Sequence, residues 1–141
     1  MGFKDDAEIA GLVRQFESGE INPADFKHYQ HLAVALWYVA HFPFEQACDD
    51  MRNGIQKLAA LYGKMGYHET ITLFWLELVA RFFAETPRGE PLSKTANRLA
   101  LELPKNLILD YYSEELVNSA DAKAHWVEPD LNPLAVRVFR L

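Results

Sequence analysis

Three histidines and one glutamate of this chain have the types and spacing that could bind a metal ion. His28 and His31 are three residues apart, so a helix would place both imidazoles on one face, with Cβ atoms about 5–6 Å apart. His68 and Glu69 are neighbours later in the chain. Imidazole nitrogens and carboxylate oxygens are common ligands of divalent cations. We therefore expect His28, His31 and His68 to be metal ligands if the fold brings them together.

The helices that carry these histidines are expected to place them at one end of a bundle. Hydrophobic periodicity, with proline and glycine breaks, predicts helices over about 24–42, 44–62 and 68–85. Short connections make consecutive helices antiparallel. The first and third of these helices therefore begin at the same end. Because the histidines lie near those two beginnings, the topology predicts that they are close in space.

A site of this composition would support metal-dependent chemistry. Two or three imidazoles and a carboxylate suit zinc, iron, nickel or manganese, and they leave a coordination position for water or substrate. Glu69 would be the catalytic base or a further ligand. Tyr67 and Thr72 would donate hydrogen bonds at the binding site, and Trp75 would exclude water from its wall. The first hypothesis is therefore a metal-dependent enzyme that acts on a small polar or anionic molecule.

A non-catalytic function is the alternative. The same histidines and Glu69 could form a buried hydrogen-bond network that fixes the register of the helices. The protein would then be a helical interaction module or a binding module for a small ligand, and it would need no metal. A His-x-x-His pair is a short motif that also occurs by chance, so both hypotheses stay open at this point.

The pattern as a whole is typical of an all-α protein. We expect one domain over residues 1–141, a bundle of about four main helices followed by short helices and an irregular C-terminal wrap. Ser93, Ser113 and Ser119 are each expected to cap a later helix. Residues 136–141 could form a tail.

Composition excludes several classes of partner. Twenty acidic residues against 14 basic ones give a formal charge of −6, and no basic run could follow a nucleic-acid backbone. No apolar stretch is long enough to span a membrane, and the N-terminus lacks the apolar core of a secretory signal. We therefore expect a cytoplasmic protein whose partner is a small molecule.

Four elements of the sequence together resemble a family of small uncharacterised bacterial helical proteins. These elements are Phe26-x-His28-x-x-His31-Leu32, Tyr67-His68-Glu69-Thr70-x-Thr72-x-x-Trp75, Tyr112-Ser113, and Trp126-Val127-Glu128-Pro129-Asp130-Leu131-x-Pro133. The resemblance covers most of the chain after about residue 15. It implies an all-helical fold and indicates where to look for a site, but it implies no reaction.

Overall fold

The computed structural model describes residues 2–63 and 66–134, and these residues form helices and connecting segments without a β-strand. The prediction of an all-α fold is therefore confirmed. The longer helices are α1 (Asp6–Ser18), α2 (His28–His41), α3 (Phe44–Tyr62), α4 (Glu69–Ala84) and α5 (Leu92–Glu102). The shorter ones are the 3-10 helices η1 (Pro23–Asp25) and η2 (Lys105–Asp110), and the α-helices α6 (Glu114–Val117) and α7 (Ala120–Ala124).

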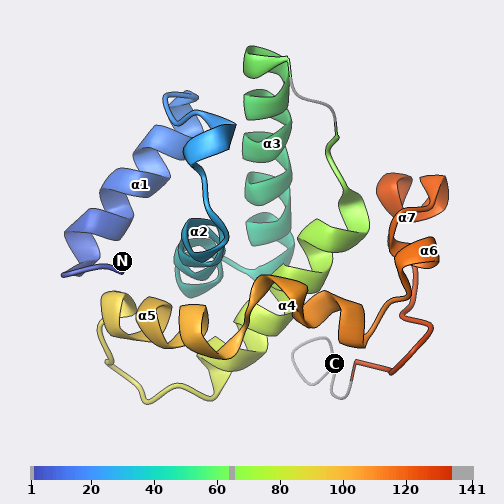
Figure 1. Cartoon of the computed structure of the whole chain (residues 1–141). Coiled ribbons are helices and arrows are strands. Elements are labelled where there is room, and N and C mark those ends of the chain that lie inside the picture. Colours follow the sequence, from blue (N-terminus) through green and yellow to red (C-terminus); the bar gives the residue numbers. More distant parts are fainter. Residues whose placement is uncertain (1, 64–65, 135–141) are drawn as a thin grey trace.

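Helix α2 lies at the centre of the bundle, and α1, α3, α4 and α5 pack around it (Figure 1). Its sequence explains this position, because each residue in the run 32–36 is at most 2% exposed. A helix that is apolar on most of its faces is stable in water only when other elements cover those faces. The central place of α2 thus follows from its composition.

Helix α4 joins two hydrophobic clusters. Leu76 and Val79 belong to the main cluster, which is built with α1, α2, α3 and α5. Phe74 and Leu78 belong to a smaller cluster with η2, α6 and the C-terminal segment. Trp75 packs against both clusters. The C-terminal third therefore covers the face of α4 that the other long helices leave uncovered.

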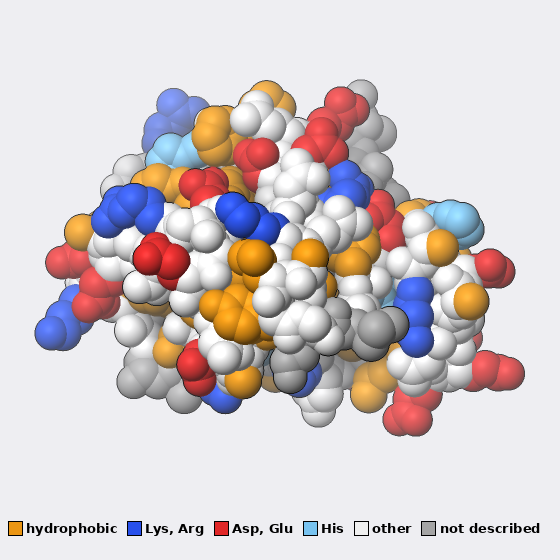
Figure 2. Space-filling model, turned by 90° about the horizontal axis from the view of Figure 1, so that it is seen from above, with side chains coloured by type: hydrophobic (Ala, Val, Ile, Leu, Met, Phe, Trp, Pro, Cys, Tyr) orange, Lys and Arg blue, Asp and Glu red, His pale blue; other side chains and the backbone are white. Residues whose placement is uncertain are grey.

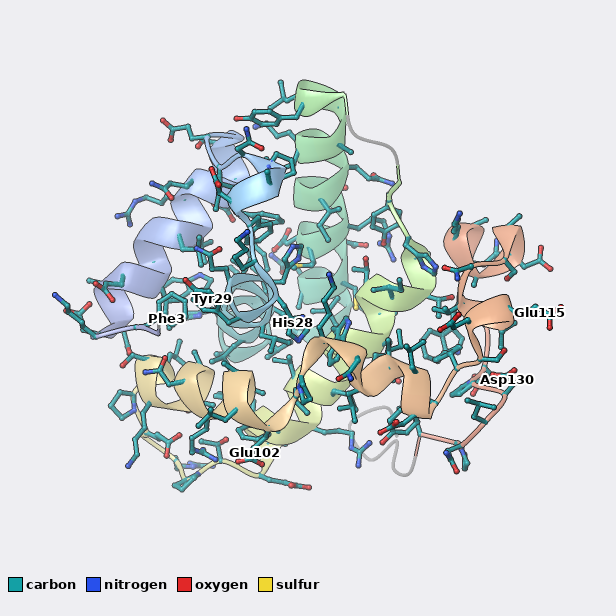
Figure 3. The ribbon with its side chains drawn as sticks, in the orientation of Figure 1. Phe3, His28, Tyr29, Glu102, Glu115 and Asp130 are labelled. Atoms are coloured by element: carbon teal, nitrogen blue, oxygen red, sulfur yellow. The ribbon has the colours of Figure 1, made fainter. Side chains whose placement is uncertain are left out.

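The C-terminal third is held by caps and by one carboxylate. Ser113 and Ser119 cap α6 and α7 as predicted, because each side-chain oxygen accepts a backbone N–H at 3.1 Å. The N–H and the hydroxyl of Ser113 both donate to the carboxylate of Asp130, at 2.8 and 2.7 Å, which places Asp130 beside α6 (Figure 3). The predicted irregular wrap is present, whereas the tail predicted over 136–141 lies outside the described residues.

The second long helix begins later than the sequence predicts. In place of a continuous helix from about residue 24, η1 ends and the chain extends through Phe26 and Lys27 before α2 begins at His28. Phe26 is 7% exposed, and its ring stacks on His31 with 3.8 Å between centroids. The break lets the chain turn so that Phe26 enters the core. The free energy gained by burying this ring outweighs the helical propensity of the segment.

The cap of α5 also differs from the prediction. The sequence predicts Ser93 as the N-cap of this helix, but the N-cap residue is Pro91 and α5 begins at Leu92. The carboxylate of Asp6 accepts the N–H groups of Leu92 and Ser93, at 3.2 and 2.8 Å. These hydrogen bonds hold the pKa of Asp6 below its ordinary value. The first N–H groups of a helix need acceptors, and here a distant part of the chain supplies one.

The surface mixes charges of both signs. On the face seen from above, Lys and Arg side chains are interspersed with Asp and Glu side chains (Figure 2). The basic side chains visible on this face form no continuous stripe of the kind that follows a nucleic-acid backbone. Within residues 2–63 and 66–134, no helix combines the length and the apolar character needed to cross a membrane.

Gly54 of α3 lets the Phe16 ring of α1 pack directly against the backbone of α3. A Cβ atom at this position would overlap the ring of Phe16, which is fully buried. We expect Gly54→Ala to lower the free energy of unfolding by about 1–3 kcal/mol, because overpacking forces the ring or the helix to move. Urea denaturation would measure the change.

Gly11→Ala is the matched control for this substitution. Gly11 also lies within a helix, but its added Cβ would meet only the Arg14 side chain, at 3.7 Å. We expect this change to raise stability by about 0.5–1 kcal/mol through helix propensity. Equal effects of the two substitutions would contradict the close packing of α1 on α3.

Candidate ligand-binding cavity

A partly enclosed cavity of about 370 Å³ lies between the N-terminal ends of α2 and α4. Most of its wall is apolar, and α2, α3, α4 and η2 all contribute to it. The polar residues of the lining are His28, His31, His68, Thr72 and Lys105. The helix directions expected from the sequence therefore correspond to a real convergence of the three histidines on one cavity.

The sequence-predicted residues divide into two groups. His28, His31, His68, Thr72 and Trp75 line the cavity. Tyr67 and Glu69 are not among its lining residues, and their side chains are directed toward α3. The cavity therefore collects the expected imidazoles without the expected carboxylate.

His28 ties the beginning of α2 to the end of α5. Its Nε2 donates to the carbonyl oxygen of Leu103, at 2.8 Å, and Leu103 is the C-cap residue directly after α5. The ring also packs edge-on against Trp75, with 4.7 Å between centroids. Burial lowers the pKa of His28, although the bond to Leu103 opposes this effect. At neutral pH this imidazole is uncharged, and it lies near the middle of the molecule (Figure 3).

His31 is also a neutral imidazole. Burial lowers its pKa to about 4, and the neighbouring His28 and Lys105 act in the same direction. A hydrogen bond to the backbone of Phe26 opposes the shift. The imidazole stacks on the Phe26 ring. It therefore fills the wall between α2 and the segment before it.

His68 caps α4 and binds α6 at the same time. Its Nδ1 accepts the N–H of Ile71 at 3.1 Å, and its Nε2 donates to the carbonyl oxygen of Val117 at 2.6 Å. Val117 is the last residue of α6. Both ring nitrogens are therefore used by the backbone, and the ring is fixed as the Nε2–H tautomer. Thr72 supports this turn, because its hydroxyl donates to the carbonyl of His68 at 2.8 Å.

Glu69 forms an ion pair with α3. Arg52 donates to its two carboxylate oxygens at 3.0 and 2.7 Å, and the hydroxyl of Tyr67 donates to one of them. Arg52 also donates to Asp49 at 2.7 Å. The guanidinium holds the pKa of Glu69 below its ordinary value, whereas burial and the carboxylate raise the pKa of Tyr67 to about 12. A partly buried carboxylate needs a compensating charge, and Arg52 supplies it here.

These contacts bear on the predicted metal site. Within the described residues, no group of three or more His, Cys, Asp or Glu side chains is placed to hold a metal ion. His68 uses both nitrogens on the backbone, and Glu69 is held by Arg52. This arrangement does not fit a site for zinc, iron, nickel or manganese. The divalent metal stays a prediction from the sequence, and this geometry adds no support to it.

Sequence reasoning missed three residues that shape this region. Arg52 pairs with Glu69, and Thr70 donates its hydroxyl to the carbonyl of His125 at 2.7 Å. Lys105 lines the cavity from η2. The signal for Lys105 is a single cation two residues before the apolar run Leu107-Ile108-Leu109. Arg52 and Thr70 could be found only from the packing of helices.

Glu69→Gln tests the ion pair with Arg52. We expect a loss of about 1–3 kcal/mol of unfolding free energy at pH 7, because the amide cannot accept two charge-assisted bonds. The folded-state pKa lies below the ordinary value of 4.5. The stabilisation is therefore present above about pH 4.5 and is lost as the pH falls through the folded-state pKa. Urea denaturation from pH 7 to pH 3 should show the unfolding free energy of the wild type approaching that of the variant.

Glu85→Gln is the control for that comparison. Glu85 is the C-cap residue of the same helix and is exposed, so we expect a change of no more than about 0.5 kcal/mol at any of these pH values. A pH-independent difference between the wild type and Glu69→Gln would contradict the ionic character of the contact.

Comparison of the chain with protein-family models, with curated proteins and with solved structures finds no match. A proposal for the function therefore depends on the geometry of the cavity.

Proposed function

We propose that this protein binds a small, mainly apolar molecule in the cavity between the N-terminal ends of α2 and α4. The observation that carries the proposal is the cavity itself, with about 370 Å³ of space and a mostly apolar wall. Ligand pockets in proteins typically enclose about 300–1,000 Å³ and combine apolar walls with a few polar groups. This cavity has both properties.

The volume of the cavity favours a ligand-binding pocket over a defect in packing. Protein interiors are packed as densely as organic crystals, and they rarely leave voids larger than a water molecule. Here the space lies beside well-packed residues of α2, of which Leu32 is 1% and Ala35 is 2% exposed. The apolar wall of this partly open space is exposed to water, and a bound apolar molecule would remove that surface from water.

The histidines take a structural part in this proposal. His28 and His68 donate to backbone carbonyls, and His31 stacks on Phe26. Each ring is thereby held in one orientation at the wall of the cavity. This corresponds to the alternative hypothesis from the sequence, in which the imidazoles form a structural network around a ligand-binding module. Their role is to shape the pocket, and no catalytic step is assigned to them.

Ala35→Leu tests whether the cavity binds ligands. The larger side chain would occupy the cavity that Ala35 lines. Two aromatic probes, 2-naphthamide and 2-naphthoate, would be titrated into labelled protein while the methyl signals of Met51, Ile55 and Ile71 are followed by NMR. We expect saturable shifts in the wild type and weakened or absent binding in the variant.

Ala33→Leu is the matched control. Ala33 lies on the same helix and is fully buried, but it does not line the cavity. We expect this control to lose about 1–3 kcal/mol of stability through overpacking, while Ala35→Leu loses less. Absence of probe-induced shifts in the wild type, or equal destabilisation by both changes, would contradict the proposal.

Removal of two imidazoles separates ligand binding from the metal hypothesis. We expect His28→Ala/His31→Ala to lower the melting temperature, because the Leu103 carbonyl loses its donor and Phe26 loses its stacking partner. Elemental analysis of untagged protein, purified without chelators and then reconstituted with zinc, iron, nickel or manganese, would measure metal content. Near-stoichiometric metal that is lost in the double variant would favour the metal hypothesis and contradict a purely structural role.

His41→Ala is the control for this measurement. His41 ends the same helix but is exposed, and its Nδ1 is hydrogen-bonded to the backbone carbonyl of Trp37. It does not line the cavity. We expect it to leave metal content and probe binding as in the wild type.

A further inference from the structure

The ionisable side chains that line the cavity are all basic. The lining contains three imidazoles and the ammonium of Lys105, and no described lining residue is an aspartate or a glutamate. This composition is unusual for a chain that has 20 acidic and 14 basic residues. A cavity with a cation and without a carboxylate favours an anionic ligand over a cationic one.

Lys105 lies at the opening of the cavity. It is exposed to solvent and also lines the cavity, so its side chain extends along the boundary between the two. Its charge acts on both His28 and His31, where it lowers the pKa of each imidazole. Lys105 and both imidazole rings line the same cavity. Within the described part of the chain, no carboxylate lies within ion-pair distance of it.

The other polar groups of the lining already have partners. The N–H of His28 donates to Leu103, that of His68 donates to Val117, and the hydroxyl of Thr72 donates to His68. The imidazole of His31 is hydrogen-bonded to the backbone of Phe26. An incoming acceptor would displace one of these bonds or use Lys105. The ammonium is thus the donor that a ligand can engage without disturbing the helix ends.

We propose that the ligand is an amphiphilic carboxylate, whose apolar body fills the cavity and whose carboxylate contacts Lys105 at the opening. This inference rests on the proposed function and names the class of ligand. A single ammonium matches one negative charge. A doubly charged phosphate would keep uncompensated charge beside neutral imidazoles, which is unfavourable at a partly buried site.

A pair of probes with the same rings tests this class. At pH 7, 2-naphthoate carries one negative charge, whereas 2-naphthamide is neutral. We expect wild-type protein to bind the carboxylate about threefold to tenfold more tightly, the range of a partly exposed charge-assisted contact. NMR titration would give both dissociation constants, and added salt should reduce the preference.

Lys105→Met should abolish the preference for 2-naphthoate over 2-naphthamide, because the variant has no ammonium to contact the carboxylate. The side chain stays unbranched and similar in size but loses its ammonium group, and its exposed position lets the variant fold. Lys94→Met is the matched control, because Lys94 is exposed on α5 and does not line the cavity. We expect this control to bind both probes as the wild type does.

The outcomes separate the two proposals. Equal binding of both probes at the cavity, or a carboxylate preference that survives in Lys105→Met, would overturn the ligand class and leave the binding function intact. Failure of both probes to shift the signals of cavity residues in the wild type would overturn the binding function itself.

Discussion

The first turn of α4 is the junction on which much of the structure depends. Three successive residues there connect the helix to three other parts of the chain. His68 binds the end of α6, Glu69 binds Arg52 of α3, and Thr70 binds the backbone of His125 after α7. Each contact also satisfies a polar group that would be costly to bury without a partner. This turn therefore sets the position of α4 relative to both hydrophobic clusters.

The character of the cavity follows from that junction. Because the polar atoms of His68, Glu69 and Thr72 are engaged within the protein, they contribute little hydrogen-bonding capacity to the space between α2 and α4. What faces the space is mainly apolar surface, with neutral imidazole rings and the ammonium of Lys105. The same bonds that stabilise the helix ends thus make the cavity suitable for an apolar ligand with one charged group.

Local patterns account for the parts of the fold that depend on local physics. Periodicity and short connections predicted the central helices and the convergence of His28 and His68, since both depend on helix direction alone. The pairs Asp6–Ser93 and Arg52–Glu69 were not predictable in this way, because each joins segments that only tertiary packing brings together. The apolar wall of the cavity could be anticipated, but the partners of its polar residues could not.

The spacing that suggested a metal site has a second physical origin at helix ends. The last carbonyls of a helix lack intrahelical donors, and its first N–H groups lack acceptors. A neutral imidazole carries one donor and one acceptor, so one ring can serve two helix ends at once. His68 does this between α4 and α6, and His28 donates to the carbonyl that ends α5. In this chain, His28 and His68 therefore lie together because helix ends meet there, and their types and spacing resemble a metal-ligand set although these nitrogens bond to the backbone.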